Sequence, residues 1–144
     1  MSETIRFTAI FVNLPVADVG RATRFYEAIG GSLNPMFSDE KASCIVLNDN
    51  VYFMLLHREF FQSFLERPVA DTTAAVGAIS AVSVESREDV DAVADAGVAA
   101  GGIDAQRPVD MGFMYSRQIQ DPDGNVLEFL WMDSAAAQNG PPTE

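Results

Sequence analysis

The sequence contains few of the residues that build disulfides, metal clusters and nucleophilic active sites, with one cysteine and one histidine in 144 residues. A single cysteine cannot form a disulfide within the chain, and the sequence has no CxxC pair or Cys/His cluster. We therefore exclude a small disulfide-rich scaffold and a zinc-ribbon protein.

Basic residues are also scarce. The chain has 9 Lys and Arg against 21 Asp and Glu, which gives a formal net charge of −12. Such an acidic surface repels nucleic-acid phosphates and anionic lipids, so we expect neither nucleic acid nor a membrane as a partner.

Long apolar runs are missing as well. The longest, such as residues 51–56, fall far short of the roughly 20 residues that cross a bilayer. Glu3 stands where a secretory signal peptide carries positive charge, and no signal-like cleavage site follows it. These features predict a cytoplasmic protein.

The composition is otherwise that of a globular protein, with 48% hydrophobic residues in a chain long enough for one domain. Residues 5–14 are mostly apolar and predict a buried strand, and Asp18 then caps a helix that Gly30 and Gly31 end. The helix has one apolar stripe, which consists of Val19, Ala22, Phe25, Tyr26 and Ile29. Residues 43–56 predict a hairpin with its turn at residues 48–50.

The second half of the chain repeats this order. A strand at 78–84 precedes a helix whose first turn, Ser86 with Asp89, resembles a capping box. Two further strands, 112–120 and 126–131, flank the turn residues Asp121-Pro122-Asp123-Gly124. Asp18, Gly30 and Gly31 recur 71 residues later as Asp89, Gly101 and Gly102. We predict two tandem βαβββ units, with common order but no common ancestry as the alternative.

The two units, about 5–56 and 78–132, are predicted to form one domain over residues 1–133. A connecting helix is expected at about 57–67, because Phe60, Phe61, Phe64 and Leu65 give that stretch an apolar face. It packs on the core in our preferred interpretation, and a lid or a dimer contact are the alternatives. Residues 134–144 show no periodicity and predict a flexible tail.

Three segments in order resemble the vicinal oxygen chelate superfamily, which includes glyoxalases, bleomycin-resistance proteins and extradiol dioxygenases. They are Phe11-Val12-Asn13-Leu14-Pro15-Val16-Ala17-Asp18, Phe25-Tyr26-Glu27-Ala28-Ile29-Gly30 and Asp121-Pro122-Asp123-Gly124-Asn125-Val126-Leu127-Glu128. The resemblance covers about residues 5–132. It implies an α+β fold in which paired βαβββ units form curled mixed sheets around a cleft, and it implies a homodimer.

The resemblance also implies where the family's divalent metal is held, by two His, Gln or Glu ligands from each unit. The matching positions are Phe11, Phe53 (with Met54 as the alternative), Ile79 and Glu128. Phenylalanine and isoleucine have no lone pair to donate, and one carboxylate cannot hold a divalent cation against water. We therefore predict no metal and no cofactor at this site.

A metal-free cleft favours a small-molecule binding protein, as the bleomycin-resistance proteins are, and its ligand is unidentified. Glu128, in an apolar strand, is the candidate for a remaining acid–base activity, so the sequence does not decide whether the protein is an enzyme. The predicted ligand-binding residues are Phe11, Asn13, Phe53, Ile79, Met114, Ser116, Gln118 and Glu128. The alternatives are a metal-dependent glyoxalase-like lyase, isomerase or dioxygenase, and an interaction subunit with a filled cleft.

The single histidine and the single cysteine are weaker candidates. His57 can serve as a base or be an exposed residue at the end of a strand. A turn at residues 48–50 pairs Ile45 with Phe53 and sets His57 opposite Lys41 rather than Cys44. We therefore expect Cys44 to be a small buried apolar residue and not a nucleophile.

Overall fold

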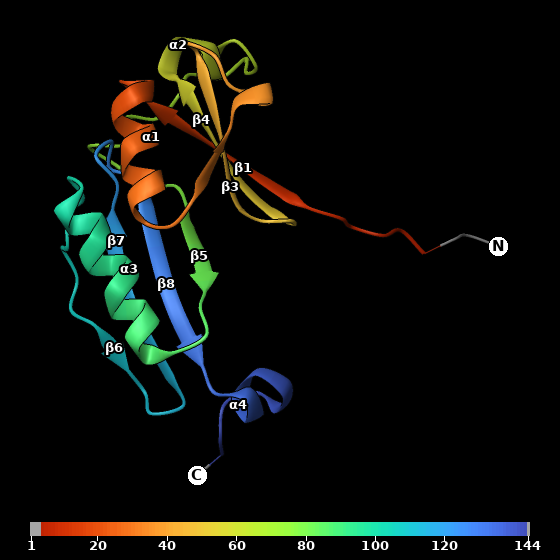
Figure 1. The fold of residues 1–144 in the computed structure, drawn as a ribbon, viewed down its shortest axis with the longest axis vertical. Helices are drawn as coiled ribbons and strands as arrows, with labels where there is room; N and C mark the ends of the chain where they lie inside the picture. The colour runs from red at the N-terminus through yellow and green to blue at the C-terminus, as the bar shows by residue number, and fades with distance from the viewer. Residues whose placement is uncertain (1–3, 144) are drawn as a thin grey trace.

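The computed structural model describes residues 4–143 and confirms the α+β fold of two βαβββ units (Figure 1). The first unit consists of β1 (Ile10–Val16), α1 (Val19–Ala28), β2 (Ser32–Asn34), the short 3₁₀ helix η1 (Pro35–Phe37), β3 (Ala42–Asn48) and β4 (Val51–His57). The helix α2 (Arg58–Gln62) begins the connection. The second unit consists of β5 (Ile79–Ser83), α3 (Arg87–Ala99), β6 (Val109–Asp110), β7 (Met114–Gln120) and β8 (Val126–Met132), and α4 (Ser134–Asn139) follows it.

Each unit forms one four-stranded mixed sheet, and the two sheets have the same topology. The strand order is β1-β4-β3-β2 in the first sheet and β5-β8-β7-β6 in the second. The β1–β4 and β5–β8 pairs are parallel, whereas the remaining pairs are antiparallel. The sheets do not close into a barrel, so β1 and β5 are edge strands.

The caps of the two helices repeat with a different spacing from the one predicted. The Asp18 carboxylate accepts a hydrogen bond from Arg21 N, and the Ser86 hydroxyl accepts one from Asp89 N. The two caps are therefore 68 residues apart (86 − 18), and the prediction that Asp89 corresponds to the capping Asp18 is wrong. The closing glycines, Gly30 and Gly101, both have positive φ angles, 110° and 105°, and α3 is the longer helix by three residues.

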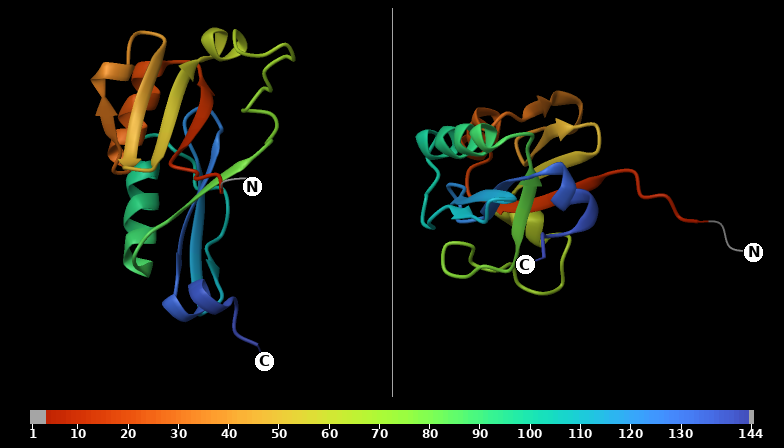
Figure 2. Two further views of the ribbon diagram at one scale, coloured as in Figure 1. Left: turned by 90° about the vertical axis from the view of Figure 1, so that its right-hand side faces the viewer. Right: turned by 90° about the horizontal axis from the view of Figure 1, so that it is seen from below.

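Both helices cover the same side of the molecule and share one apolar core (Figures 1 and 2). Gly97 in α3 allows this close packing, because a Cβ there would lie 2.4 Å from Ile119 and 3.3 Å from Ile29 of the first unit. The largest buried core side chains are Phe25, Tyr26, Ile45, Phe53, Leu55, Ile119 and Leu127. The core thus contains side chains from both units. None of the helices between residues 4 and 143 has the length and apolar character needed to cross a bilayer.

Two predicted segments differ from the structure. The connecting helix ends at Gln62 instead of residue 67, because the Gln62 side chain bonds to Leu65 O, Arg67 O and Val69 N and turns the chain back. The stretch predicted as an irregular tail contains α4, whose first turn Asp133 caps through Ala136 N at 2.7 Å. A cap and one buried side chain, Ala136, are sufficient for a short helix that has no apolar periodicity.

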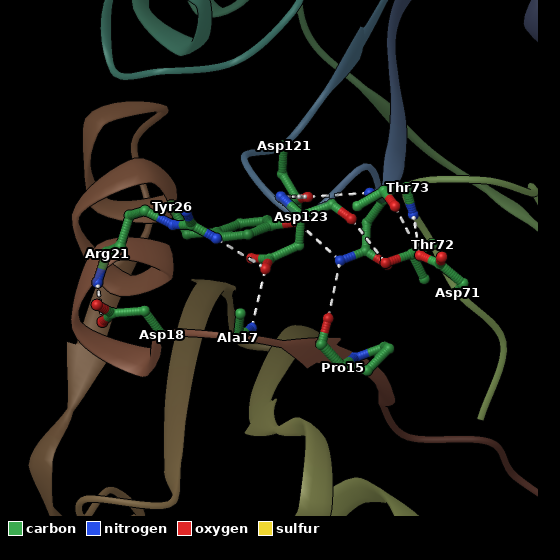
Figure 3. Close-up of polar contacts among 11 residues, drawn as sticks. Pro15, Ala17, Asp18, Arg21, Tyr26, Asp71, Thr72, Thr73, Asp121 and Asp123 are labelled. Carbon is green, nitrogen blue, oxygen red and sulfur yellow. Dashed lines mark hydrogen bonds and ion pairs between the residues drawn. The ribbon is translucent and has the colours of Figure 1, made fainter. Parts of the chain in front are cut away.

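The loop between β7 and β8 is built around a carboxylate that has no access to water. Asp121 is 0% exposed and accepts hydrogen bonds from Asp123 N, Asn125 N and the Asn125 side chain at 2.8, 2.9 and 3.0 Å. Its fourth donor is the Tyr26 hydroxyl of α1, at 2.8 Å (Figure 3). Burial raises the pKa of Asp121 above its usual value, and these donors oppose that rise.

Other groups of the same loop bind the first unit and the connection (Figure 3). Asp123 Oδ1 accepts from Ala17 N and from the Arg21 guanidinium, both at 2.9 Å. The Thr72 hydroxyl donates to Asp123 O at 2.6 Å. Gly124 has a φ of 87°, and a Cβ on it would lie 2.2 Å from Thr72 O, so only glycine fits. The turn predicted from the sequence is thus the polar junction between the two units.

The junction yields a first prediction. Tyr26→Phe should lower the free energy of unfolding by about 1–3 kcal/mol, because it leaves a buried carboxylate without one of its donors. Tyr115→Phe is the matched control, since the Tyr115 hydroxyl donates to Asp91, whose side chain is 51% exposed and can bind water instead. Urea denaturation measures both, and equal losses in the two variants would contradict the role of the junction.

Candidate functional site

The first sheet packs one of its faces against α1. We call its other face, which points away from α1, the first open face. Residues directly across from one another in a sheet point to the same side, and Phe53 and Ile45 point to the α1 side. The neighbouring positions therefore point away from the helix. One row across the four strands of the first open face consists of Asn13, Met54, Cys44 and Asn34.

A pocket of about 430 Å³ lies on the first open face. Its lining residues are Phe11, Asn13, Asn34, Phe37, Cys44, Tyr52 and Met54. The Phe11 and Tyr52 rings stack at 4.5 Å with an interplanar angle of 8°, which forms a flat aromatic wall. Such walls suit planar or apolar ligands.

Two amides lie beside this wall. Asn13 Nδ2 donates to Phe11 O at 3.1 Å, and Asn34 Oδ1 accepts from Met36 N at 3.1 Å. Each amide thus uses one polar atom within the chain, and among residues 4–143 its other polar atom has no hydrogen-bond partner. The pocket therefore combines an aromatic surface with one acceptor and one donor that are available to a ligand.

Phe53, predicted to lie in the cleft beside Phe11, does not lie there. It is 1% exposed and packs against Tyr26 with ring centroids 5.1 Å apart, beneath α1. The parallel register pairs Phe11 with Tyr52, so Phe53 is one residue out of phase with the first open face. Met54, the alternative position, lies on that face instead.

The second open face is the corresponding face of the second sheet, opposite α3. Ala81, Glu128 and Gln118 form one row across β5, β8 and β7. Glu128 is half-buried on the central strand β8, beside the Gln118 amide, so it is not an edge residue. The predicted site residues on this side of the sheet are Ile79, Met114, Ser116, Gln118 and Glu128, of which Ser116 is buried.

The predicted site residues are therefore divided between two sheets. The pocket that contains Phe11 has no residue of the second unit, whereas Asn13 also lines a second pocket together with Ser80 and Val126. The two units lie end to end along the long axis of the molecule, with the first sheet above the second (Figure 2). One chain thus offers two separate open faces.

The residues at the positions where the sequence resemblance implies metal ligands do not fit a divalent cation. Those on the open faces are Phe11, Met54, Ile79 and Glu128, which offer one hard donor group, a carboxylate, and one soft thioether. Hard divalent cations need several oxygen or imidazole ligands. Across residues 4–143, no three His, Cys, Asp or Glu side chains gather closely enough to bind such an ion.

Sequence reasoning missed Asn34, Phe37, Cys44 and Tyr52 as pocket residues and gave Met54 only as an alternative to Phe53. Tyr52 could have been found, because the parallel pairing of β1 with β4 sets it beside Phe11. Asn34 and Phe37 gave no signal, since β2 and η1 are too short to show periodicity. Asn34 and Phe37 line the pocket because the chain after α1 folds back and pairs β2 with β3.

The structure confirms the predicted register around the other candidates. Ile45 pairs with Phe53, and His57 N donates to Lys41 O at 2.8 Å. Cys44 pairs with Met54 and is 2% exposed. Burial raises the pKa of the Cys44 thiol, which reduces the thiolate fraction that a nucleophile needs.

Two βαβββ units with mixed, open sheets and helices on one side define the class of paired βαβββ proteins. Residues 8–129 match the family model of the Glyoxalase/Bleomycin resistance protein/Dioxygenase superfamily, and the chain belongs to this superfamily. No curated protein sequence matches the chain. The resemblance inferred from the three sequence motifs is thus confirmed.

Solved structures share this fold. A hypothetical protein from S. aureus, SA1046, is 24% identical with a TM-score of 0.73, over 90% of this chain and 95% of its own. A glyoxalase-related enzyme from Fulvimarina pelagi is 21% identical with a TM-score of 0.73, over 88% of each chain. A lactoylglutathione lyase from Agrobacterium tumefaciens is 18% identical with a TM-score of 0.64, over 89% of this chain and 96% of its own.

The burial of Cys44 yields a second prediction. Iodoacetamide should alkylate Cys44 in the folded protein at least about 10-fold more slowly than in denaturing urea, because the thiol is covered and resists ionisation. Intact-mass spectrometry over time measures both rates. Equal rates would show that the pocket exposes this thiol.

Proposed function

We propose that the protein binds a small organic molecule without a metal ion, in a cleft that two copies of the chain form together. The first open face of one copy and the second open face of the other are the two walls. The observation that carries this proposal is the pocket with its stacked rings and available amides, in which Phe11 and Met54 occupy positions where the sequence resemblance implies metal ligands. Such a pocket can bind an organic ligand without an electrophilic group such as a metal ion.

The free sheet edges support a homodimer. β1 and β5 each have one neighbouring strand, and Phe11 and Ile79 on these strands are both 53% exposed. Covering a large apolar side chain stabilises an assembly by about 1.5–3 kcal/mol relative to leaving it in water. A twofold axis would set each first open face against the partner's second open face and would generate two identical clefts.

The chemistry of the two walls favours a neutral or cationic aromatic ligand. Phe11 and Tyr52 offer a stacking surface, and Asn13 and Asn34 offer hydrogen bonds. Glu128 of the partner subunit would add a carboxylate that attracts a cation. The net charge of −12 disfavours anionic ligands at long range.

Glu128 is also the group through which an acid–base activity would operate. It is the one carboxylate among the predicted site residues, and the Gln118 amide lies directly across from it. A carboxylate can transfer a proton to a bound ligand, but the residues of these walls supply no strong electrophile to stabilise an enediolate. Binding is therefore the primary role in this proposal, in the cytoplasm as predicted from the sequence.

Metal independence yields a third prediction. Protein purified without chelators should contain no tightly bound metal, and titration with Ni²⁺, Zn²⁺, Mn²⁺ or Fe²⁺ should leave its melting temperature unchanged. Elemental analysis and thermal denaturation measure this. One equivalent per chain that disappears in Glu128→Ala would favour the alternative, a metal-dependent lyase, isomerase or dioxygenase.

Ligand binding yields a fourth prediction. In a thermal-shift screen of metabolites and aromatic drugs, bleomycin included, at least one compound should raise the melting temperature, because it binds only the folded state. The shift should disappear in Phe11→Ala and in Glu128→Gln. It should persist in Val98→Ala and Glu88→Gln, which alter partly exposed or exposed positions of α3 away from both open faces.

A mixing experiment then tests whether the cleft is shared. Phe11→Ala and Glu128→Gln chains, unfolded together and refolded, should recover about one quarter of the wild-type binding sites, because half of the dimers are mixed and each has one intact cleft. Equilibrium dialysis with the compound found in the screen counts the sites. Recovery of none would mean that each cleft belongs to one chain.

A further inference from the structure

The two amides of the pocket on the first open face are fixed in opposite senses by the backbone. Asn13 Nδ2 donates to Phe11 O at 3.1 Å, and a carbonyl oxygen can only accept, so Asn13 Oδ1 is the atom left for a ligand. Asn34 Oδ1 accepts from Met36 N at 3.1 Å, and a backbone N–H can only donate, so Asn34 Nδ2 is the atom left there. One amide therefore offers an acceptor and the other offers a donor.

These two amides stand at opposite ends of one row of side chains. The row crosses all four strands of the sheet, from Asn13 on β1 over Met54 and Cys44 to Asn34 on β2. Neighbouring strands are about 4.8 Å apart, so three spacings separate the two backbones by about 14 Å. A hydrogen bond of about 2.9 Å at each end leaves about 8–9 Å between the two ligand atoms that meet the amides. A single aromatic ring is too short to reach both.

The surface between the two amides is apolar and uncharged. Met54 is half-buried and Cys44 is 2% exposed, so neither offers a strong polar group to a ligand. The Tyr52 hydroxyl donates to Asp49 O at 2.9 Å, so its proton is already used. None of the residues that the structure describes in the lining of this pocket carries a charge. A charged group in the middle of a ligand would therefore lose its water without gaining a partner.

We propose that the ligand is an elongated, planar and neutral molecule with a hydrogen-bond donor at one end and an acceptor at the other. Its donor meets Asn13 Oδ1, its acceptor meets Asn34 Nδ2, and its apolar middle lies over Met54 and Cys44. The inference rests on the proposed function and narrows the ligand class of the same pocket. The pocket volume of about 430 Å³ suits a body of about two fused rings.

Three naphthalene probes test the two ends of the ligand separately. The first, 6-acetyl-2-naphthylamine, has an amine donor and a carbonyl acceptor at opposite ends of two fused rings. Its N,N-dimethyl derivative lacks the donor, and 6-ethyl-2-naphthylamine lacks the acceptor. Isothermal titration calorimetry should give dissociation constants at least about 5-fold higher for the second and third probes, because each leaves one amide of the protein without a partner.

Two variants assign each preference to one amide. Asn34→Asp keeps the acceptor for Met36 N but removes the donor, so the acetyl amine should lose its advantage over the ethyl amine. Asn13→Leu is nearly isosteric and has no acceptor, so the acetyl amine should lose its advantage over the dimethylated probe. Asn139→Asp, on the exposed end of α4, adds the same charge outside the pocket. It should keep both ratios within about 3-fold of the wild-type values.

The outcomes separate this inference from the proposed function. Equal affinities of the three probes for the wild-type protein would overturn the two-ended ligand and leave the proposed function standing, because the pocket would then bind rings without recognising their ends. Preferences that survive in Asn34→Asp and Asn13→Leu would overturn it too, because other residues would cause them. If none of the three probes binds, this ligand class is wrong, and the wider thermal-shift screen still decides the proposed function.

Discussion

A buried carboxylate imposes the strictest constraint in this protein. Asp121 is removed from water, and its four donors come from its own loop and from Tyr26 of the other unit. Burial and the neighbouring carboxylate hold the pKa of Tyr26 well above its usual value, so the hydroxyl stays protonated and donates. The orientation of the two units therefore depends on satisfying one charge.

The location of this junction leaves both open faces free for function. The junction and the apolar core lie around the helices, whereas Phe11, Asn13 and Glu128 lie on the sheet faces that the helices do not cover. Ligand positions on an open face can change without loss of core packing. This separation explains how the fold persists although Phe11 and Ile79, at positions where the sequence resemblance implies metal ligands, have no metal-binding group.

Features that depend on neighbouring residues were predictable from the sequence. The helix caps, the hairpin at residues 48–50 and the turn at Asp121 follow from local hydrogen bonding and from backbone preferences. Pairing Ile45 with Phe53 followed from the turn alone, since a hairpin sets the register of its strands. Placing Met114, Ser116 and Gln118 on one face required only alternation along one strand.

Features that depend on distant segments required the tertiary structure. The sequence does not distinguish Phe53 from Phe11, because both are phenylalanines in apolar strands. Only the parallel register with β1 shows that Phe53 lies under α1. Asn34 reaches the pocket because β2 and η1 fold back over β3, which no local pattern encodes. By itself the sequence determined the two units and the alternation of side chains along each strand. The tertiary structure decided which sides meet, because long-range pairing is set by core packing and buried charge rather than by neighbouring residues.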